Sequence, residues 1–293
     1  MISSAVQQMV IGALRQATGT AVTAVQFSPV GGGSINQTFR VHTNTQAQYF
    51  CKLNSAKKFP GLFRCEQQGL ELLGKQQVMR VPAVIACMET GEHQVLLLEW
   101  IEQGIKTEAF WRLFGKELAA LHQVTSDQFG LNSNNYMGAL PQHNHPSDNW
   151  CNFFATRRLE PQVRMAVDSG LLPTTYIPRF DNLYCKLPVI FPVEPPALLH
   201  GDLWSGNYLC DAQGRPVLID PAVYYGHSSV DMAMTTLFGG FDEPFYEAYR
   251  YYRPLPANYR EQWEIANLYP LLIHLNLFGA GYLADIVHTL RRF

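Results

Sequence analysis

Short runs of β-prone residues, separated by turn formers, dominate the first hundred residues after an amphipathic N-terminal helix. These runs cover residues 22–30, 36–42, 48–53, 83–88 and 94–101. Gly31, Gly32, Gly33 and Ser34 separate the first two runs, which predicts a hairpin with a glycine-rich turn. A helical spacing of apolar residues at about 61–77 lies between the third and fourth runs. The pattern therefore predicts an antiparallel sheet with one inserted helix.

The pattern changes after Ile101. Apolar spacing predicts helices at 108–124 and 147–167, and over most of the chain after Ser228. One short β hairpin, with strands at 208–210 and 217–219, is the expected interruption. At 293 residues the chain is longer than one hydrophobic core usually supports. We therefore expect an α+β protein of two lobes, a sheet lobe at 1–101 and a larger, mostly helical lobe at 102–293.

Composition narrows the class of protein. With 47% hydrophobic and 16% charged residues, the chain has enough apolar material for a large core and is expected to be globular. The net charge of −2 and the lack of any Lys/Arg-rich run argue against nucleic acid or an anionic membrane as a main partner. The apolar stretch at 269–290 contains too many polar residues for a membrane span, and the N-terminus lacks a secretory signal. The six cysteines are scattered without zinc-site spacing. We expect a cytoplasmic protein with reduced thiols.

The strongest chemical signal is HGDLWSGN at residues 200–207, followed by the hairpin that ends at Asp220. It has the spacing H-x-D-x-x-x-x-N of kinase catalytic loops, in which the Asp accepts the proton of the substrate hydroxyl and the Asn binds a metal ion. Asp202 is therefore the candidate catalytic base. Because a hairpin returns the chain to its start, Asn207 and Asp220 are expected to lie together and to offer oxygen ligands to Mg²⁺. The alternative is that these Asp and Asn residues only cap turns.

Lys52 and Glu66 are predicted to form an ion pair in the first lobe. Lys52 lies at the end of a β run, and Glu66 shares the apolar face of a helix with Leu70 and Leu73, where its carboxylate needs a partner. A strand Lys paired with a helix Glu is the kinase arrangement that holds the α- and β-phosphates of ATP. The alternative is an ordinary ion pair at the surface.

Two further segments are candidates for nucleotide binding. Backbone N–H groups of the turn at Gly31, Gly32 and Gly33 could cover phosphates, although glycine runs more often serve only as turns. The buried strand that ends in Glu99, Trp100 and Ile101 could offer its backbone to an adenine ring. A plain core strand is the alternative there.

Several segments resemble the fructosamine kinase family, and the resemblance covers nearly the whole chain. The segments are GGGSINQTFRV, FPGLFRCEQQGLELL, FGLNSNNYMGALPQHNHPSDNWCNFFATRRLEPQ, LLHGDLWSGN, IDPAVYYGHSSVDMAM and LFGGF. The resemblance implies a protein-kinase-like fold, ATP as the phosphate donor, and as acceptor the 3-hydroxyl of a ketoamine, a sugar joined to an amine after Amadori rearrangement. It further implies a role in deglycation.

The sequence also departs from protein kinases. Asp220-Pro221-Ala222 stands in place of D-F-G, Trp204 stands where protein kinases carry a basic residue, and A-P-E is absent. Only ten residues separate Asp220 from Asp231, which leaves no room for a long activation loop. The acceptor is therefore expected to be small or carried on a flexible side chain. By resemblance to related kinases, Asp231 is expected to accept backbone N–H bonds that hold the catalytic loop, or else to be a helix-start acid.

Two rival functions share most of these residues. A kinase acting on an aminoglycoside, choline or a similar amine-bearing alcohol would handle phosphate in the same way, and the middle segment argues against it. A nucleotide-binding pseudokinase is the other rival, and the presence of Lys52, Asp202, Asn207 and Asp220 argues against it. The sequence leaves open whether the ketoamine is a fructosamine or a ribulosamine, and whether it is free or attached to a protein lysine.

Overall fold

The chain forms two compact units. The computed structural model describes residues 2–31 and 35–293, so Gly32 and Gly33 of the expected glycine turn lie outside the described residues. The first unit contains the chain up to Ile105 together with residues 209–220. The second contains residues 106–208 and 221–293. The functional division at residues 101 and 102 stays a prediction.

An antiparallel five-stranded sheet forms the centre of the first unit, in the order β1-β2-β3-β5-β4. Its strands are β1 (Val25–Pro29), β2 (Gln37–Thr43), β3 (Gln48–Ser55), β4 (Val84–Glu89) and β5 (His93–Glu99). In the middle of the sheet, Lys52 on β3 stands opposite Thr38 of β2 and Leu96 of β5. The predicted antiparallel sheet with one inserted helix is therefore confirmed.

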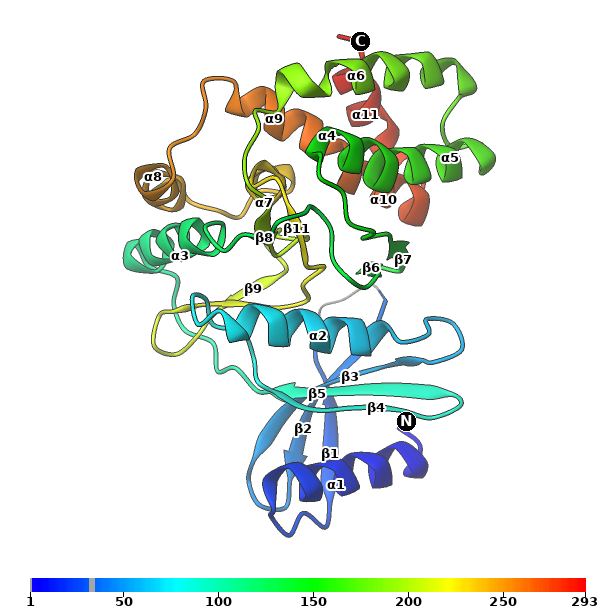
Figure 1. Cartoon of the computed structure of the whole chain (residues 1–293). Helices are drawn as coiled ribbons and strands as arrows, with labels where there is room; N and C mark the ends of the chain where they lie inside the picture. The colour runs from blue at the N-terminus through cyan, green and yellow to red at the C-terminus, as the bar shows by residue number, and fades with distance from the viewer. Residues whose placement is uncertain (1, 32–34) are drawn as a thin grey trace. The chain divides into compact units, whose positions relative to one another are not determined.

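Two helices, α1 (Ser4–Thr18) and α2 (Leu62–Lys75), cover opposite faces of this sheet (Figure 1). Because side chains alternate along a strand, Cys51 and Leu53 point to the face covered by α1, where they join its apolar residues in one core. Lys52 points to the other face, where it meets Glu66 of α2. The predicted alternation along β3 is thereby confirmed.

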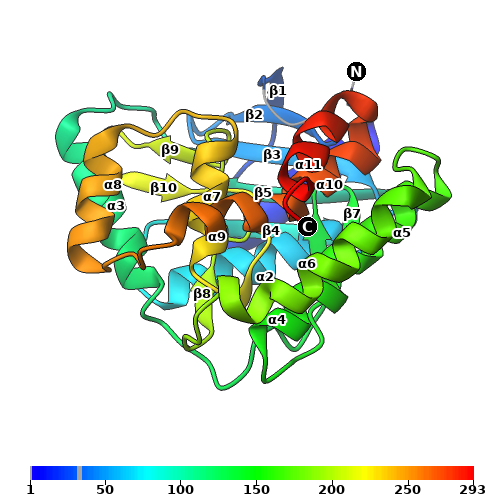
Figure 2. The ribbon, with the colours of Figure 1, turned by 90° about the horizontal axis from the view of Figure 1, so that it is seen from above.

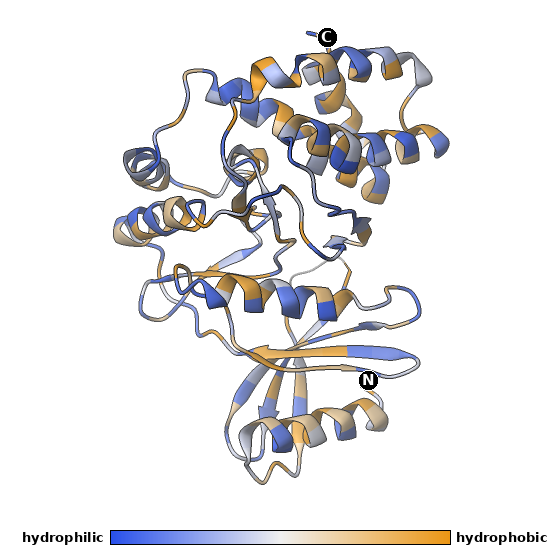
Figure 3. Cartoon of the chain, in the orientation of Figure 1, coloured by the Kyte–Doolittle hydropathy of each residue, from blue (hydrophilic) through white to orange (hydrophobic). Residues whose placement is uncertain are grey.

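The strand β5 is strongly apolar over part of its length. Val95, Leu96, Leu97 and Leu98 are all buried, whereas His93 and Gln94 lie toward the turn that joins β4 to β5. Figure 3 shows the same change along this strand, from apolar at its exit to polar at its beginning. The part of β5 up to Leu98 is thus buried in the first unit, and its last residue, Glu99, is half-buried.

The second unit is mainly helical. Its α-helices are α3 (Glu108–Leu121), α4 (Trp150–Phe153), α5 (Glu160–Asp168), α6 (Ile177–Ile190), α7 (Ser229–Leu237), α8 (Glu243–Tyr252), α9 (Tyr259–Ala266), α10 (Leu268–Phe278) and α11 (Leu283–Leu290). Helices α3 and α8 lie side by side (Figure 2), and α10 is buried along most of its length. In the described part of the chain, no helix is long and apolar enough to cross a membrane.

Three details of the second half differ from the expectation. The expected hairpin forms from β9 (Tyr208–Cys210) and β10 (Pro216–Leu218), but two more strand pairs exist, β6 (Asn135–Met137) with β7 (Leu140–Gln142), and β8 (Ala197–Leu199) with β11 (Tyr224–Gly226). The expectation of a single hairpin after Ile101 was therefore wrong. Strands of three residues are too short to show a two-residue period. In addition, the single helix expected at 147–167 is divided by a π-helical turn at Phe154–Leu159.

Candidate active site

Lys52 is the centre of a charged cluster in the first unit. Its side chain is only 2% exposed, and its Nζ donates to Oε1 of Glu66 at 2.6 Å and to Oδ1 of Asp220. The strand β3 provides Lys52, the helix α2 provides Glu66, and the segment after β10 provides Asp220. The Lys52–Glu66 contact agrees with the sequence pattern, whereas the contact with Asp220 was not foreseen.

Two carboxylates share this one ammonium group, and the pKa values of Lys52 and Glu66 reflect it. Burial by itself would lower the pKa of Lys52, but the charges of Asp220 and Glu66 outweigh burial and raise it. Burial raises the pKa of Glu66 to about 7, although Lys52 partly opposes this increase and the charge of Asp220 adds to it. The two carboxylates therefore favour the charged form of Lys52 in the folded protein.

Asp220 has an uncommon backbone conformation. Its φ is +54°, in the left-handed region that residues other than glycine rarely adopt. Such strain persists only where the surroundings fix it, and it is frequent at functional sites. Because the Asp220 side chain is 37% exposed while bonded to buried Lys52, it can present a carboxylate oxygen to a hard cation such as Mg²⁺.

The expected adenine contact lies where β5 ends. The N–H of Glu99 donates to the carbonyl oxygen of Ala83 at 2.8 Å, and the Glu99 carboxylate accepts from Arg80 at 2.5 Å and from the N–H of Ala83 at 3.1 Å. Trp100 donates from its indole to Glu102, and Ile101 is buried. Binding of adenine by this segment stays a prediction, as does phosphate binding by the glycine turn, of which the structure describes only Gly31.

The catalytic-loop motif lies in the second unit, where Asp202 and Asn207 contact each other. The Nδ2 of Asn207 donates to Oδ2 of Asp202 at 2.9 Å and to its carbonyl oxygen at 2.8 Å. Asp202 is partly exposed and Asn207 is buried. Because the amide nitrogen of Asn207 faces Asp202, its oxygen faces away and has the chemistry of a metal ligand.

Gly201 in this loop has a conformation and surroundings that require glycine. Its φ is +83°, and a Cβ atom there would lie 2.2 Å from the carbonyl oxygen of Ala222. The segment between β10 and β11 therefore approaches the loop directly, and the N–H of Ala222 donates to the carbonyl oxygen of His200 at 2.9 Å. The glycine of H-G-D thus allows this close contact.

Asp231, near the start of α7, binds the backbone of the loop at residues 200–207 through its side chain. Its fully buried carboxylate accepts from the N–H groups of His200 at 2.7 Å and Gly201 at 2.8 Å, which confirms the expected contact. It also meets Nε2 of His122 at 3.2 Å, and Nδ1 of His122 meets the hydroxyl of Tyr249 at 2.7 Å. Burial by itself disfavours the charged form, but hydrogen bonds and nearby positive charge outweigh it and lower the pKa of Asp231.

Sequence reasoning missed His122 and Tyr249. A usable signal existed for His122, because it lies four residues after Leu118 and so shares the buried face of α3. A polar residue on such a face needs a partner.

Sequence reasoning also missed Arg158, which is fully buried in the π-helical turn of the middle segment. Its guanidinium donates to Oδ1 of Asn144 at 2.7 Å and to the carbonyl oxygen of His143 at 2.5 Å, and it lies 4.0 Å from the ring centre of Tyr224. Amides of the same segment hold the chain after Asp220, since Asn135 donates to Val223 and Gln142 donates to Ala222. The distinctive middle segment is therefore built around a buried cation and amide side chains.

Trp204 marks the part of the loop that faces solvent. It is 38% exposed, its ring lies against Gly206, and it makes an edge contact with Phe238 at 6.0 Å between ring centres. Phe238 in turn contacts His274 at 5.0 Å between ring centres. An aromatic surface thus begins two residues after Asp202.

The predicted metal ligands stand in different units, Asn207 in the second and Asp220 in the first. Each offers one hard oxygen atom, which suits a cation that also binds phosphate and water. Their convergence on one Mg²⁺ ion stays a prediction.

A sequence profile of the fructosamine kinase family matches residues 6–293. The chain belongs to the fructosamine kinase family. The probable ketoamine kinase of Synechocystis sp. is 40% identical over 285 residues, which cover 96% of this chain and 94% of that relative. The chloroplastic protein-ribulosamine 3-kinase of Arabidopsis thaliana is 34% identical over 278 residues, which cover 90% of this chain and 81% of that relative. As a member of this family, the protein is an ATP-dependent phosphotransferase.

Solved structures agree with this family. A candidate fructosamine-3-kinase from Thermobifida fusca has a TM-score of 0.86 and 33% identity, with 96% of this chain and 97% of the other covered. An amicoumacin kinase is similar with a TM-score of 0.58 and 14% identity, and the match covers 97% of this chain and 92% of that kinase. At this low identity the similarity shows a common fold alone. The expected α+β, protein-kinase-like fold is confirmed.

Proposed function

We propose that this fructosamine kinase transfers the γ-phosphoryl group of ATP to the 3-hydroxyl of a ketoamine, with Asp202 as the catalytic base. The observation that carries the proposal is the contact between Asp202 and Asn207 in a loop whose backbone is bound by buried Asp231. This arrangement fixes a partly exposed carboxylate where it can accept a hydroxyl proton. The names of the Synechocystis and Arabidopsis relatives support a ketoamine acceptor.

The remaining roles follow from the residues of each unit. In the first unit, Lys52 held by Glu66 binds the α- and β-phosphates, the turn at Gly31, Gly32 and Gly33 covers them, and the backbone at 99–101 binds adenine. Asn207 and Asp220 each give an oxygen ligand to Mg²⁺, which neutralises phosphate charge when bound.

The transfer step is a simple substitution at phosphorus. The 3-hydroxyl oxygen forms a bond to the γ-phosphorus, the bond from that phosphorus to the β,γ-bridging oxygen breaks, and ADP leaves. Asp202 accepts the hydroxyl proton. In the product, the phosphate on carbon 3 is next to the carbonyl at carbon 2, so enolisation toward carbon 1 expels inorganic phosphate. Water then adds to carbon 1 of the remaining imine, the bond between carbon 1 and nitrogen breaks, and the amine is released, which makes the reaction a route of deglycation.

The acceptor side of the proposal includes ketoamines on protein lysines as well as free ones. A small pocket is enough, because only the sugar has to reach Asp202 while the amine end points outward. The exposed ring of Trp204, two residues from Asp202, offers an apolar surface to the acceptor. A cytoplasmic location is part of the proposal, since ATP is the donor and all six cysteines are free thiols.

The test is a panel of acceptors. The protein is incubated with ATP and Mg²⁺ plus fructosamines, ribulosamines, an aminoglycoside or choline, and ADP release is followed. We expect stimulation by ketoamines only, and phosphorus and proton NMR of the fresh product should show phosphate coupled to the proton on carbon 3. Stimulation by an aminoglycoside or choline alone would favour a different acceptor. No stimulation by any acceptor would favour a pseudokinase.

A further inference from the structure

A buried carboxylate in the first unit organises the hairpin that carries Asp220. Asp211, in the turn between β9 and β10, is 2% exposed in its side chain. Its Oδ1 accepts from the N–H groups of Gln213 and Arg215, both at 2.9 Å, and its Oδ2 accepts from Arg80 at 2.9 Å and from Nε of Arg215 at 3.0 Å. Burial by itself disfavours the charged form, but these N–H groups and the Arg215 guanidinium outweigh it and lower the pKa of Asp211.

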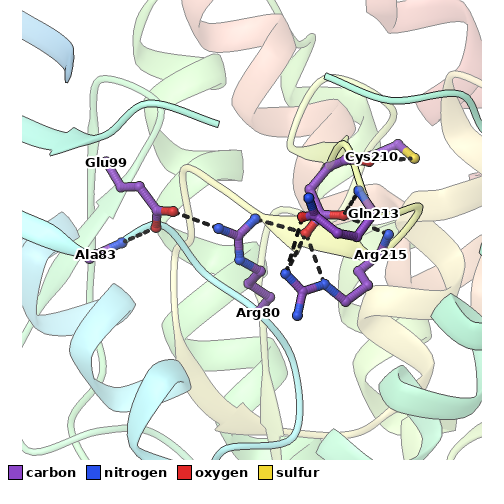
Figure 4. A network of polar contacts seen from close by, with 7 residues as sticks. Arg80, Ala83, Glu99, Cys210, Gln213 and Arg215 are labelled. Carbon is purple, nitrogen blue, oxygen red and sulfur yellow. Dashed lines mark hydrogen bonds and ion pairs between the residues drawn. The ribbon is translucent and has the colours of Figure 1, made fainter. Parts of the chain in front are cut away.

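Arg80 connects this hairpin to the end of β5. One guanidinium nitrogen, Nη1, donates to Asp211, and the other, Nη2, donates to Oε1 of Glu99 at 2.5 Å. Figure 4 shows Arg80 reaching in both directions, toward Glu99 on one side and toward the turn with Gln213 and Arg215 on the other. A planar guanidinium suits this task, because it can bind two carboxylates at fixed angles.

Backbone contacts tie both strands of the hairpin to the same unit. The N–H of Leu218 on β10 donates to the carbonyl oxygen of Arg80 at 2.9 Å, and the N–H of Gly104 donates to that of Cys210 on β9 at 2.9 Å. A Cβ atom at Gly104 would lie 2.1 Å from the carbonyl oxygen of Asp211, so the approach is as close as glycine allows. The hairpin is therefore fixed at both strands and at its turn.

Asp220 follows the anchored Leu218 by only two residues. It leaves the hairpin with a left-handed backbone and bonds Lys52, as described above. Because Asp220 lies so close to this anchor, we expect a shift of the hairpin to move Asp220 and its left-handed backbone as well.

We propose that Arg80 and Asp211 are positioning residues for the kinase reaction. They place the Asp220 carboxylate against Lys52, and Arg80 also holds the C-terminal end of β5 in place through its contact with Glu99. This inference rests on the proposed function, in which Asp220 binds Mg²⁺ and residues 99–101 bind adenine. Neither Arg80 nor Asp211 is assigned any contact with a substrate.

The test uses Arg80→Met and Asp211→Asn, with the more conservative Arg80→Lys as a third variant. Arg112→Met is the matched control, because Arg112 also bridges two carboxylates, Glu108 and Glu247, but at an exposed position on α3. Binding of ATP with Mg²⁺ is measured without acceptor by titration calorimetry, and the KM for ATP, the KM for ketoamine, kcat and the melting temperature are measured for each protein.

We expect Arg80→Met and Asp211→Asn to weaken binding of ATP with Mg²⁺ and to raise the KM for ATP by about 10- to 100-fold, as loss of outer-shell support for metal ligands does. The KM for ketoamine should stay within about twofold, because the acceptor does not contact this hairpin in the proposed function. Arg80→Lys should show an intermediate defect, since an ammonium lacks the planar fork that joins both carboxylates. Arg112→Met should match wild type.

A role limited to stability would lower the melting temperature while leaving ATP binding per folded molecule unchanged, and that result would overturn the inference. If Arg80→Met or Asp211→Asn does not fold, Arg80→Lys decides the matter by the same comparison. Wild-type protein that binds ATP but phosphorylates no ketoamine would contradict the proposed function instead, and the binding measurements would still test the positioning role.

Discussion

Asp231 accepts hydrogen bonds from the N–H groups of His200 and Gly201, at 2.7 and 2.8 Å, with its two carboxylate oxygens. The two donors precede Asp202 directly, so the position of the proposed base depends on a carboxylate that is completely buried. A buried charge that loses its hydrogen bonds is costly, and this contact therefore links the stability of the second unit to the geometry of the loop.

Asp231→Asn should lower the free energy of unfolding by roughly 3 kcal/mol at neutral pH, because a buried charge network loses one partner. The pKa of Asp231 is lowered in the folded protein, so its contribution is full above the unfolded value of about 3.9 and is lost as the pH falls through the folded pKa. The difference in free energy of unfolding between variant and wild type should thus shrink below about pH 4.

Urea unfolding at several pH values measures this difference, with exposed Asp285→Asn as control. A difference that stays constant down to pH 2 would contradict this account.

Asp202→Asn should reduce turnover by about 10²- to 10⁴-fold, because the amide cannot accept the hydroxyl proton. ATP binding should remain, since Asp202 is not assigned a contact with the nucleotide. Single-turnover kinetics and calorimetry of the same protein separate the two effects. Asp168→Asn, an exposed change at the end of α5, is the control. Turnover near that of wild type would show that Asp202 is not the base.

Lys52→Met should raise the KM for ATP and lower the stability, because buried Glu66 would lose the cation and hydrogen-bond donor that it contacts. Adding Glu66→Gln should cost less than the sum of the single changes, with a coupling of about 1 kcal/mol or more. A double-mutant cycle on urea unfolding measures the coupling. Strict additivity would mean that the 2.6 Å contact contributes nothing.

Asn207→Ala and Asp220→Asn should each raise the Mg²⁺ concentration for half-maximal activity by at least about 10-fold, since each removes or weakens an oxygen ligand. Activity is titrated with Mg²⁺ at saturating ATP and ketoamine. If both curves coincide with that of wild type, neither residue binds the metal.

Arg158→Met should cost about 1–3 kcal/mol for each acceptor left without a donor, Oδ1 of Asn144 and the carbonyl oxygen of His143. Its neighbour Arg157 is not buried, so Arg157→Met is the matched control and should have little effect. Chemical unfolding of both variants gives the comparison. Equal stability of the two would mean that the buried cation is not needed for the middle segment.

Sequence patterns correctly predicted the features that depend on residues close together in the chain. The two-residue period of β3 and the helical period of α2 placed Lys52 and Glu66 on facing surfaces, and the spacing from His200 to Asn207 identified the loop. The fold class followed from the same periods and from the family resemblance.

What escaped prediction depends on contacts between distant residues. Arg80 and Asp211 are 131 residues apart, and His122 and Asp231 are 109 apart. Periodicity shows which face of an element is buried, but it does not name the partner across that face. The π-helical turn at Arg158 escaped for another reason, because it contains only 6 residues and is too short to show a period of its own.

The assignment of residues 209–220 to the first unit has a consequence for biosynthesis. The chain passes between the units three times, after residues 105, 208 and 220. When a ribosome has made only the first 105 residues, Asp211 and Asp220 have not yet been synthesised. At that stage Arg80 lacks the carboxylate of Asp211, and Lys52 lacks that of Asp220. The first unit therefore reaches its final charge balance only after residues 106–208 of the second unit have been synthesised, and a truncated N-terminal fragment should be a poor substitute for the first unit.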